Sequence, residues 1–176
     1  MRKKRRRGFS LGEILVAVAI VAVIGAVVLP SLSGTLSKGD TGRVQADLTA
    51  IQTGVQQFLA DVRRYPASVQ QLLKVISGSD NDLVNNTAYN ATQIARWRGP
   101  YLQKDSAGVL NTGYFSHITS AFTKTTFNGA SWLTISVVID SLSAFDIDKA
   151  MDDGSVATGV VQWTGGTMKF FAMPIQ

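Results

Sequence analysis

Hydrophobic residues follow different patterns along the chain. Between residues 9 and 32 nearly every position is apolar, which predicts a helix that lies in a membrane or in the core of an assembly. In residues 33–66 the apolar positions recur every three or four residues, which predicts an amphipathic helix. These positions are Val44, Leu48, Ile51, Val55, Phe58, Leu59 and Val62. Residues 32–42 are rich in Ser, Gly and Thr, and they form either a loose joint or a weak stretch of one continuous helix.

The remaining residues, 67–176, have the pattern of a globular domain that ends in antiparallel strands. Asn128-Gly129 and Gly165-Gly166 are turn dipeptides typical of β-hairpins. The strands that they join are predicted at residues 120–127, 130–140, 160–164 and 167–173. The apolar residues that alternate along the second strand should face the amphipathic helix; they are Leu133, Ile135, Val137 and Ile139. The predicted fold is therefore α+β, with a long N-terminal helix packed on a four-stranded antiparallel sheet.

The N-terminus combines a basic segment with one carboxylate at the start of the apolar stretch. Residues 2–7 are all Lys or Arg, Gly8 follows them, and Glu13 lies near the start of the apolar stretch. A charge in a membrane segment is unfavourable by several kcal/mol unless a partner neutralises it. Cleavage after Gly8 would create an amine at Phe9, about one helical turn before Glu13. Pairing between Glu13 and this amine, in the same or in a neighbouring subunit, would offset the desolvation of both groups. The cross-subunit pairing predicts a filament, because a head-to-tail contact repeats unless it closes into a ring.

This arrangement resembles the prepilin signature of type IV pilins and of the pseudopilins of type II secretion. The resemblance rests on the basic leader, Gly8, Phe9, Glu13 and the apolar run with Pro30. It implies a pilin-like fold, cleavage by a prepilin peptidase between Gly8 and Phe9, N-methylation of Phe9 and a role for Glu13 in assembly. It divides the chain into a leader (1–8), an apolar helix (9–32), an amphipathic helix (33–66) and a globular domain (67–176). Gly12 replaces the large aliphatic residue that the family usually carries before the glutamate.

Two residues weaken the apolar helix, and two other targeting signals share its pattern. Gly25 and Pro30 disfavour helix, so a bend or a melted stretch between them is predicted in a packed filament. A secretory signal peptide and a plain signal anchor also begin with basic residues before an apolar core. Glu13 interrupts that core at its start, and no convincing signal-peptidase site follows it, which favours the prepilin interpretation.

Two further segments resemble the major pseudopilin of type II secretion. They are Arg63-Arg64-Tyr65-Pro66, at the end of the amphipathic helix, and residues 97–104, which contain Gly-Pro-Tyr-Leu. The chain has no cysteine, so it lacks the C-terminal disulfide of many pilins, and this also favours a pseudopilin. The long polar loop at residues 77–92 and the extra length favour a pilin instead.

Charge and composition argue against catalysis and against nucleic-acid binding. The formal net charge of +5 falls to −1 when the six basic residues of the leader are removed, so the mature body is nearly neutral. The single histidine, His117, has no nucleophile motif around it, and no phosphate-binding loop occurs in the chain. We expect no enzymatic activity and no organic cofactor.

An acidic cluster near the end of the chain is the candidate metal site. It consists of Asp146, Asp148, Asp152 and Asp153. Calcium binds several carboxylate and carbonyl oxygens, and the resemblance to the major pseudopilin implies a calcium site late in the chain. The spacing does not match an EF-hand loop, and charges at a helix end followed by a turn explain the same pattern.

The sequence thus predicts a filament subunit that spans the inner membrane once before assembly. The resemblance implies a helical homopolymer in the periplasm or on the cell surface. It also implies a prepilin peptidase and an inner-membrane platform driven by an ATPase as partners. Three alternatives stay open: a type IV pilin, a pseudopilin that acts as a periplasmic piston, and a membrane-anchored module that never polymerises, for example in DNA uptake.

Overall fold

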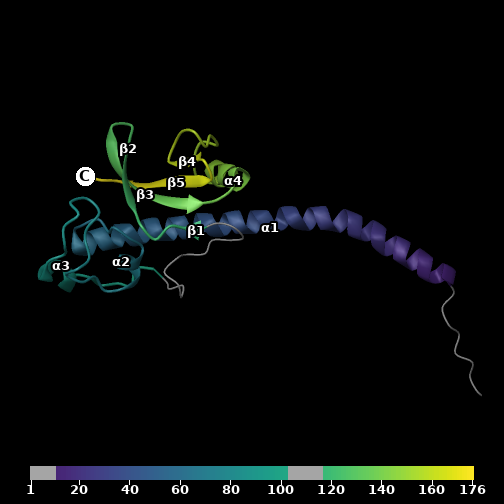
Figure 1. Ribbon diagram of the computed structural model, residues 1–176, viewed down its shortest axis with the longest axis horizontal. Coiled ribbons are helices and arrows are strands. Elements are labelled where there is room, and N and C mark those ends of the chain that lie inside the picture. The colour runs from purple at the N-terminus through teal and green to yellow at the C-terminus, as the bar shows by residue number, and fades with distance from the viewer. Residues whose placement is uncertain (1–10, 103–116) are drawn as a thin grey trace, which may run out of the picture. The chain divides into compact units, whose positions relative to one another are not determined.

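The computed structural model describes residues 11–102 and 117–176, without the side chains of residues 25–40 and of residue 117. The chain divides into two units, with the boundary between Lys38 and Gly39, and each is described by itself. Helix α1 (Leu11–Val62) belongs to both units, and all other elements belong to the second (Figure 1).

The backbone of α1 is helical without interruption from Leu11 to Val62. Of the two alternatives for residues 32–42, a continuous helix is therefore the one found. The helix also continues through Gly25 and Pro30. The predicted bend or melted stretch concerns the packed filament and stays a prediction. Within the residues that the structure describes, no helix is both long enough and apolar enough to cross a membrane. The apolar stretch 9–32 lies only partly within those residues.

The second part of α1 buries one face completely. The predicted apolar stripe is confirmed, because six of its positions are at most 1% exposed: Val44, Leu48, Ile51, Val55, Phe58 and Val62. The seventh, Leu59, is half-buried. These side chains form one core cluster with Leu133, Ile135 and Val137, which are fully buried. Burial of such side chains contributes roughly 1.5–3 kcal/mol each.

The sheet covers this stripe with antiparallel strands. The four predicted strands are present as β2 (Thr123–Phe127), β3 (Ala130–Val138), β4 (Val161–Thr164) and β5 (Thr167–Pro174). A two-residue strand, β1 (His117–Ile118), is additional. The order is β1-β3-β5-β4, and β2 pairs with the first half of β3. Asn128 and Gly129 both have positive φ, as the predicted two-residue hairpin turn requires. The α+β prediction is confirmed.

Three short helices complete the second unit: α2 (Gln70–Leu73), α3 (Ala91–Ala95) and α4 (Ser141–Met151). Figure 1 places α2 and α3 toward one end of this unit and α4 at the other end. Ser143 and Asp146 have the sequence spacing of a capping box, but they do not cap α4. Asp140 is the N-cap and accepts hydrogen bonds from the Leu142 and Ser143 amides, because it leaves β3 in an extended conformation.

Candidate functional site

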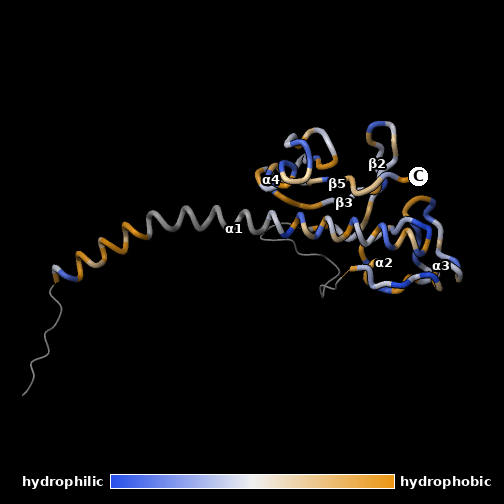
Figure 2. The backbone as a smooth tube through the Cα atoms, turned by 180° about the vertical axis from the view of Figure 1, so that it is seen from behind, coloured by the Kyte–Doolittle hydropathy of each residue, from blue (hydrophilic) through white to orange (hydrophobic). Residues whose placement is uncertain are grey.

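The first part of α1 exposes an apolar surface. Figure 2 shows that α1 is almost continuously hydrophobic before residue 25. Nine large aliphatic side chains there are 55% to 83% exposed: Leu11, Ile14, Leu15, Val16, Val18, Ile20, Val21, Val23 and Ile24. A helix that is apolar on all sides needs lipid or protein around it, because contact with water is unfavourable for every face of the helix. This surface is therefore a candidate site for insertion and assembly.

Glu13 lies in the first turn of α1, and its side chain is exposed. The partial positive charge at a helix N-terminus stabilises a carboxylate at this position. Gly8 and Phe9 lie outside the described residues, so the predicted cleavage and the pairing of Glu13 with the new amine stay predictions.

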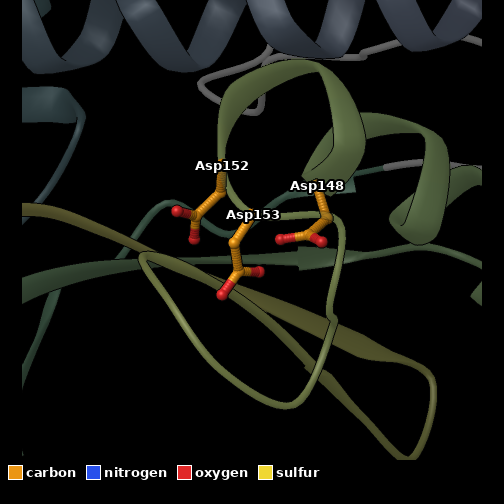
Figure 3. A group of neighbouring side chains, drawn as sticks. All are labelled: Asp148, Asp152 and Asp153. Atoms are coloured by element: carbon orange, nitrogen blue, oxygen red, sulfur yellow. The ribbon is translucent and has the colours of Figure 1, made fainter.

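The structure brings together three of the four predicted metal-binding carboxylates. One carboxylate oxygen from each of Asp148, Asp152 and Asp153 lies within 4.8 Å of the others (Figure 3). Asp148 belongs to the last turn of α4, and the other two begin the loop that leads to β4. Asp146 is exposed and outside this group, because two residues correspond to about half a helical turn. We call the three residues the Asp148 cluster.

Asp148 is the unusual member of the cluster. Its side chain is fully buried, and neither carboxylate oxygen has a hydrogen-bond partner. Burial, followed by the charges of Asp153 and Asp152, raises its pKa above the ordinary value, and the nearby Gly154 amide offsets this effect only in part. A buried carboxylate without a partner is strongly unfavourable. A divalent cation bound by the three carboxylates would remove this penalty, so the residues present fit calcium.

The other two carboxylates hold the loop between α4 and β4. Asp152 accepts hydrogen bonds from the amides of Val160 and Val161. Asp153 accepts hydrogen bonds from the Ser155 amide at 2.9 Å and from the Thr158 hydroxyl at 2.8 Å. Gly159 has a φ of +75°, and a Cβ there would collide with the Asp152 carboxylate. The sequence analysis missed Gly159 and these amides. A glycine shortly after an acidic pair was the only signal for them.

The Arg-Arg-Tyr-Pro segment fixes the loop that follows α2. The Arg64 guanidinium donates to the Asp82 carboxylate at 2.9 Å, and Asp82 is 2% exposed. Burial opposes the charge on Asp82, but hydrogen bonds from Thr87, Arg64 and Asn85 outweigh this effect and lower its pKa. Arg63, with a φ of 60°, follows the last residue of α1. The segment thus ends the helix and anchors the loop to it.

The Gly-Pro-Tyr-Leu segment packs against α1. The Tyr101 hydroxyl donates to Asp61 at 3.0 Å, and its ring meets Phe58 edge to face at 5.7 Å. A Cβ on Gly54 would lie 3.2 Å from the Leu102 side chain, so glycine permits this close approach. Both segments that resemble the major pseudopilin therefore act as structural anchors in this unit.

Comparison with known proteins supports the prepilin interpretation. Residues 3–29 match the family model described as "Prokaryotic N-terminal methylation motif". The chain is 34% identical over 77 residues to the type II secretion system core protein G of Klebsiella michiganensis, which covers 44% of this chain and 54% of that protein. The corresponding protein of Klebsiella pneumoniae is 36% identical over 74 residues, which covers 42% and 53%.

A fimbrial protein is also among the relatives. The chain is 28% identical over 78 residues to the fimbrial protein Q of Moraxella bovis, which covers 44% of this chain and 46% of that protein. The chain spans about half the length of the curated relatives it matches. No solved structure matches it significantly. These findings confirm the resemblance to pilins and pseudopilins, and none of these names denotes an enzyme.

Proposed function

We propose that this chain is a structural subunit, a pilin or pseudopilin, of a filament that assembles from the inner membrane. The observation that carries the proposal is the match of residues 3–29 to the methylation motif, together with the exposed apolar surface of α1 directly behind Glu13. The leader keeps the precursor at the membrane until a prepilin peptidase cleaves between Gly8 and Phe9.

Assembly follows from the physics of the apolar helix. Before assembly, lipid covers the aliphatic side chains of residues 11–24. In the filament, the same side chains of neighbouring subunits cover one another, so that little apolar surface meets water at any stage. The Phe9 amine of one subunit pairs with Glu13 of the next and sets the axial register. Gly25 and Pro30 allow the helix to bend or extend as subunits pack. An inner-membrane platform powered by an ATPase supplies the extraction work.

Among filament subunits we favour a type II secretion pseudopilin. Two of the relatives described above are core proteins of that system, and the chain has no cysteine with which to form a pilin disulfide. Shearing of intact cells separates the alternatives. A short periplasmic filament supports the pseudopilin, whereas abundant surface filaments favour a pilin. A complete lack of filaments favours the membrane-anchored binding module.

Mass spectrometry of the first peptide of the purified protein tests the processing step. We expect the peptide to begin with N-methylated Phe9. The Gly8→Leu variant is the matched control, because a bulky residue before the scissile bond should leave the precursor uncleaved in the membrane. A native chain that still carries residues 2–7, or one trimmed beyond Leu32, would contradict the proposal.

We also propose that the Asp148 cluster binds calcium. The buried Asp148 carboxylate supplies one oxygen that no hydrogen bond occupies, and Asp152 and Asp153 supply further oxygens from the loop. Bound calcium would supply two positive charges among three carboxylates. The ion would therefore tie the end of α4 to the loop that leads into β4.

A further inference from the structure

Most of the charged residues that the structure describes in the unit Gly39–Gln176 form two groups near its ends; Arg43, Asp47, Lys124 and Lys169 belong to neither group. Five carboxylates belong to α4 or to its immediate flanks: Asp140, Asp146, Asp148, Asp152 and Asp153. Lys149 is the one basic residue among them, so this end has a formal charge of −4. We call residues 138–153 the acidic pole.

The opposite end of the unit is basic. Five cations lie at the end of α1 or beside α2 and α3: Arg63, Arg64, Lys74, Arg96 and Arg98. With Asp61, Asp80 and Asp82 in the same region, the formal charge is +2. Arg64 pairs with Asp82, whereas Arg63, Arg96 and Arg98 are exposed and form no ion pair with any other described residue. We call this region the basic pole. Because α3 and α4 lie at opposite ends in Figure 1, one subunit cannot bring its own poles together.

Exposed apolar residues follow the same division. Among the described residues of this unit, the exposed large hydrophobic side chains are Val75, Val138, Leu142 and Phe145. Leu142 is 78% and Phe145 44% exposed, and both lie on α4 within the acidic pole together with Val138. Val75 lies beside Lys74 at the basic pole. Apolar side chains with charges around them are the usual composition of a protein–protein interface.

We propose that the acidic pole of one subunit binds the basic pole of a second copy of this chain. This inference rests on the proposed filament function and names a contact between the globular units. Opposite charges attract and like poles repel, so the pairing is head to tail, which is the geometry of an open filament. Calcium in the Asp148 cluster would leave the acidic pole with a charge of −2, so the two proposals are compatible. Salt should weaken this exposed contact, because at 0.1 M it screens charges that lie more than about 10 Å apart.

The absence of cysteine from the chain permits a clean crosslinking test. Asp146→Cys and Arg98→Cys place one thiol at each pole, and both positions are exposed and outside the Asp148 cluster. The double variant is assembled in cells that carry the assembly machinery, and sheared filaments are treated with a short thiol-specific crosslinker. We expect a ladder of multimers on a denaturing gel. Each single variant should give no ladder, because one thiol per chain cannot propagate a chain of crosslinks.

A second double variant provides the matched control. Thr126→Cys with Arg98→Cys keeps two exposed thiols but moves one of them to strand β2, away from α4. We expect no ladder from it. Filaments whose pole thiols stay uncrosslinked, or filaments in which the Thr126 pair crosslinks equally well, would overturn the pole pairing alone. If the unmodified chain forms no filaments, the proposed function fails and this inference fails with it.

Charge exchange gives an independent test without cysteines. Arg96→Glu with Arg98→Glu should lower filament yield roughly tenfold by placing acidic surfaces opposite each other. Addition of Asp146→Lys to the same chain restores an attractive pair and should recover part of that yield. Circular dichroism of each variant checks that the unit is folded. Equal yields from all three chains would contradict the proposal.

Discussion

The two parts of α1 are both rich in aliphatic residues but bury them in different ways. Between Thr41 and Val62 the apolar residues form one stripe, and the sheet of the same chain covers it completely. Between Leu11 and Ile24 they occupy every side of the helix, and large side chains there are more than half exposed. The difference shows that the second part needs only its own chain to fold, whereas the first part needs other molecules. Substitutions should therefore affect folding in one part and assembly in the other.

Loss of the Glu13 charge should have the largest effect on the first part. We expect Glu13→Ala to be cleaved and methylated normally but to lower the yield of sheared filaments by more than about tenfold, since a lost ion pair in a dry interface exceeds 1.4 kcal/mol. The unfolding of the globular unit should not change. Glu13→Gln keeps the shape of the side chain without its charge and should reduce the filament yield by the same factor. Normal filament yield from either variant would disprove the register argument.

Phe58→Ala should have the opposite consequence. Phe58 is a fully buried member of the stripe, and its ring contacts those of Tyr89 and Tyr101 edge to face, so its removal should lower the free energy of unfolding by about 3–5 kcal/mol. The matched variant in the first part of the helix is Ile20→Ala, at a side chain that is 55% exposed. It should leave unfolding unchanged and reduce assembly. Denaturant titration of the full chain in mild detergent measures the unfolding of both variants, and the yield of sheared filaments measures their assembly. Equal destabilisation by the two variants would contradict the division of α1.

The sequence revealed the second part of α1 and the sheet because their signals are local. The stripe from Val44 to Val62 follows the helical period, and Asn128-Gly129 has the φ angles that a two-residue hairpin needs. The start of α4 is not evident from the local sequence, because Ser143 and Asp146 satisfy a capping pattern although the extended backbone after β3 makes Asp140 the N-cap. Two residues near the start of α4 could cap it, and the path of the chain after β3 determines which of them does so.

The candidate metal site could be predicted only in part. The spacing of four aspartates indicated a cluster, but only the fold determines which of them face inward. Asp146 lies on the solvent side of α4, whereas Asp148 is fully buried. The backbone amides of Val160 and Val161, which hold Asp152, have no sequence signature at all. These contacts form only because the loop brings the chain back to α4. A pattern within one segment of the sequence cannot predict them.

The Asp148 cluster resembles the Glu13 region, because we propose in both cases that a cation from outside the described chain stabilises a carboxylate. Calcium in hundredfold excess over its dissociation constant should stabilise the folded protein by about 2.7 kcal/mol. Asp148→Asn should abolish this response and should raise stability without calcium, since it removes a buried charge. Asp146→Asn is the matched control and should keep the full response. Thermal melting with calcium or with a chelator measures both. An unchanged response in Asp148→Asn would exclude this cluster as the site.

The ion pair between Arg64 and Asp82 should give the smallest effect, confined to the second part of the chain. Asp82 has a lowered pKa, so its contribution to stability is complete well above the ordinary value of 3.8 and is lost as the pH falls through the lower folded value. Arg64→Ala should cost about 1–2 kcal/mol at neutral pH, because the Arg64 side chain is 34% exposed and Thr87 and Asn85 still donate to Asp82. In acid, below the folded pKa, the variant and the unmodified chain should converge in stability.

Unfolding curves at pH 7 and in acid, compared with Arg63→Ala, measure this difference. Arg63 is exposed and lies next to the same helix end, so its removal should change neither curve. A constant difference at all pH values would mean that Arg64 acts through packing rather than through the Asp82 charge.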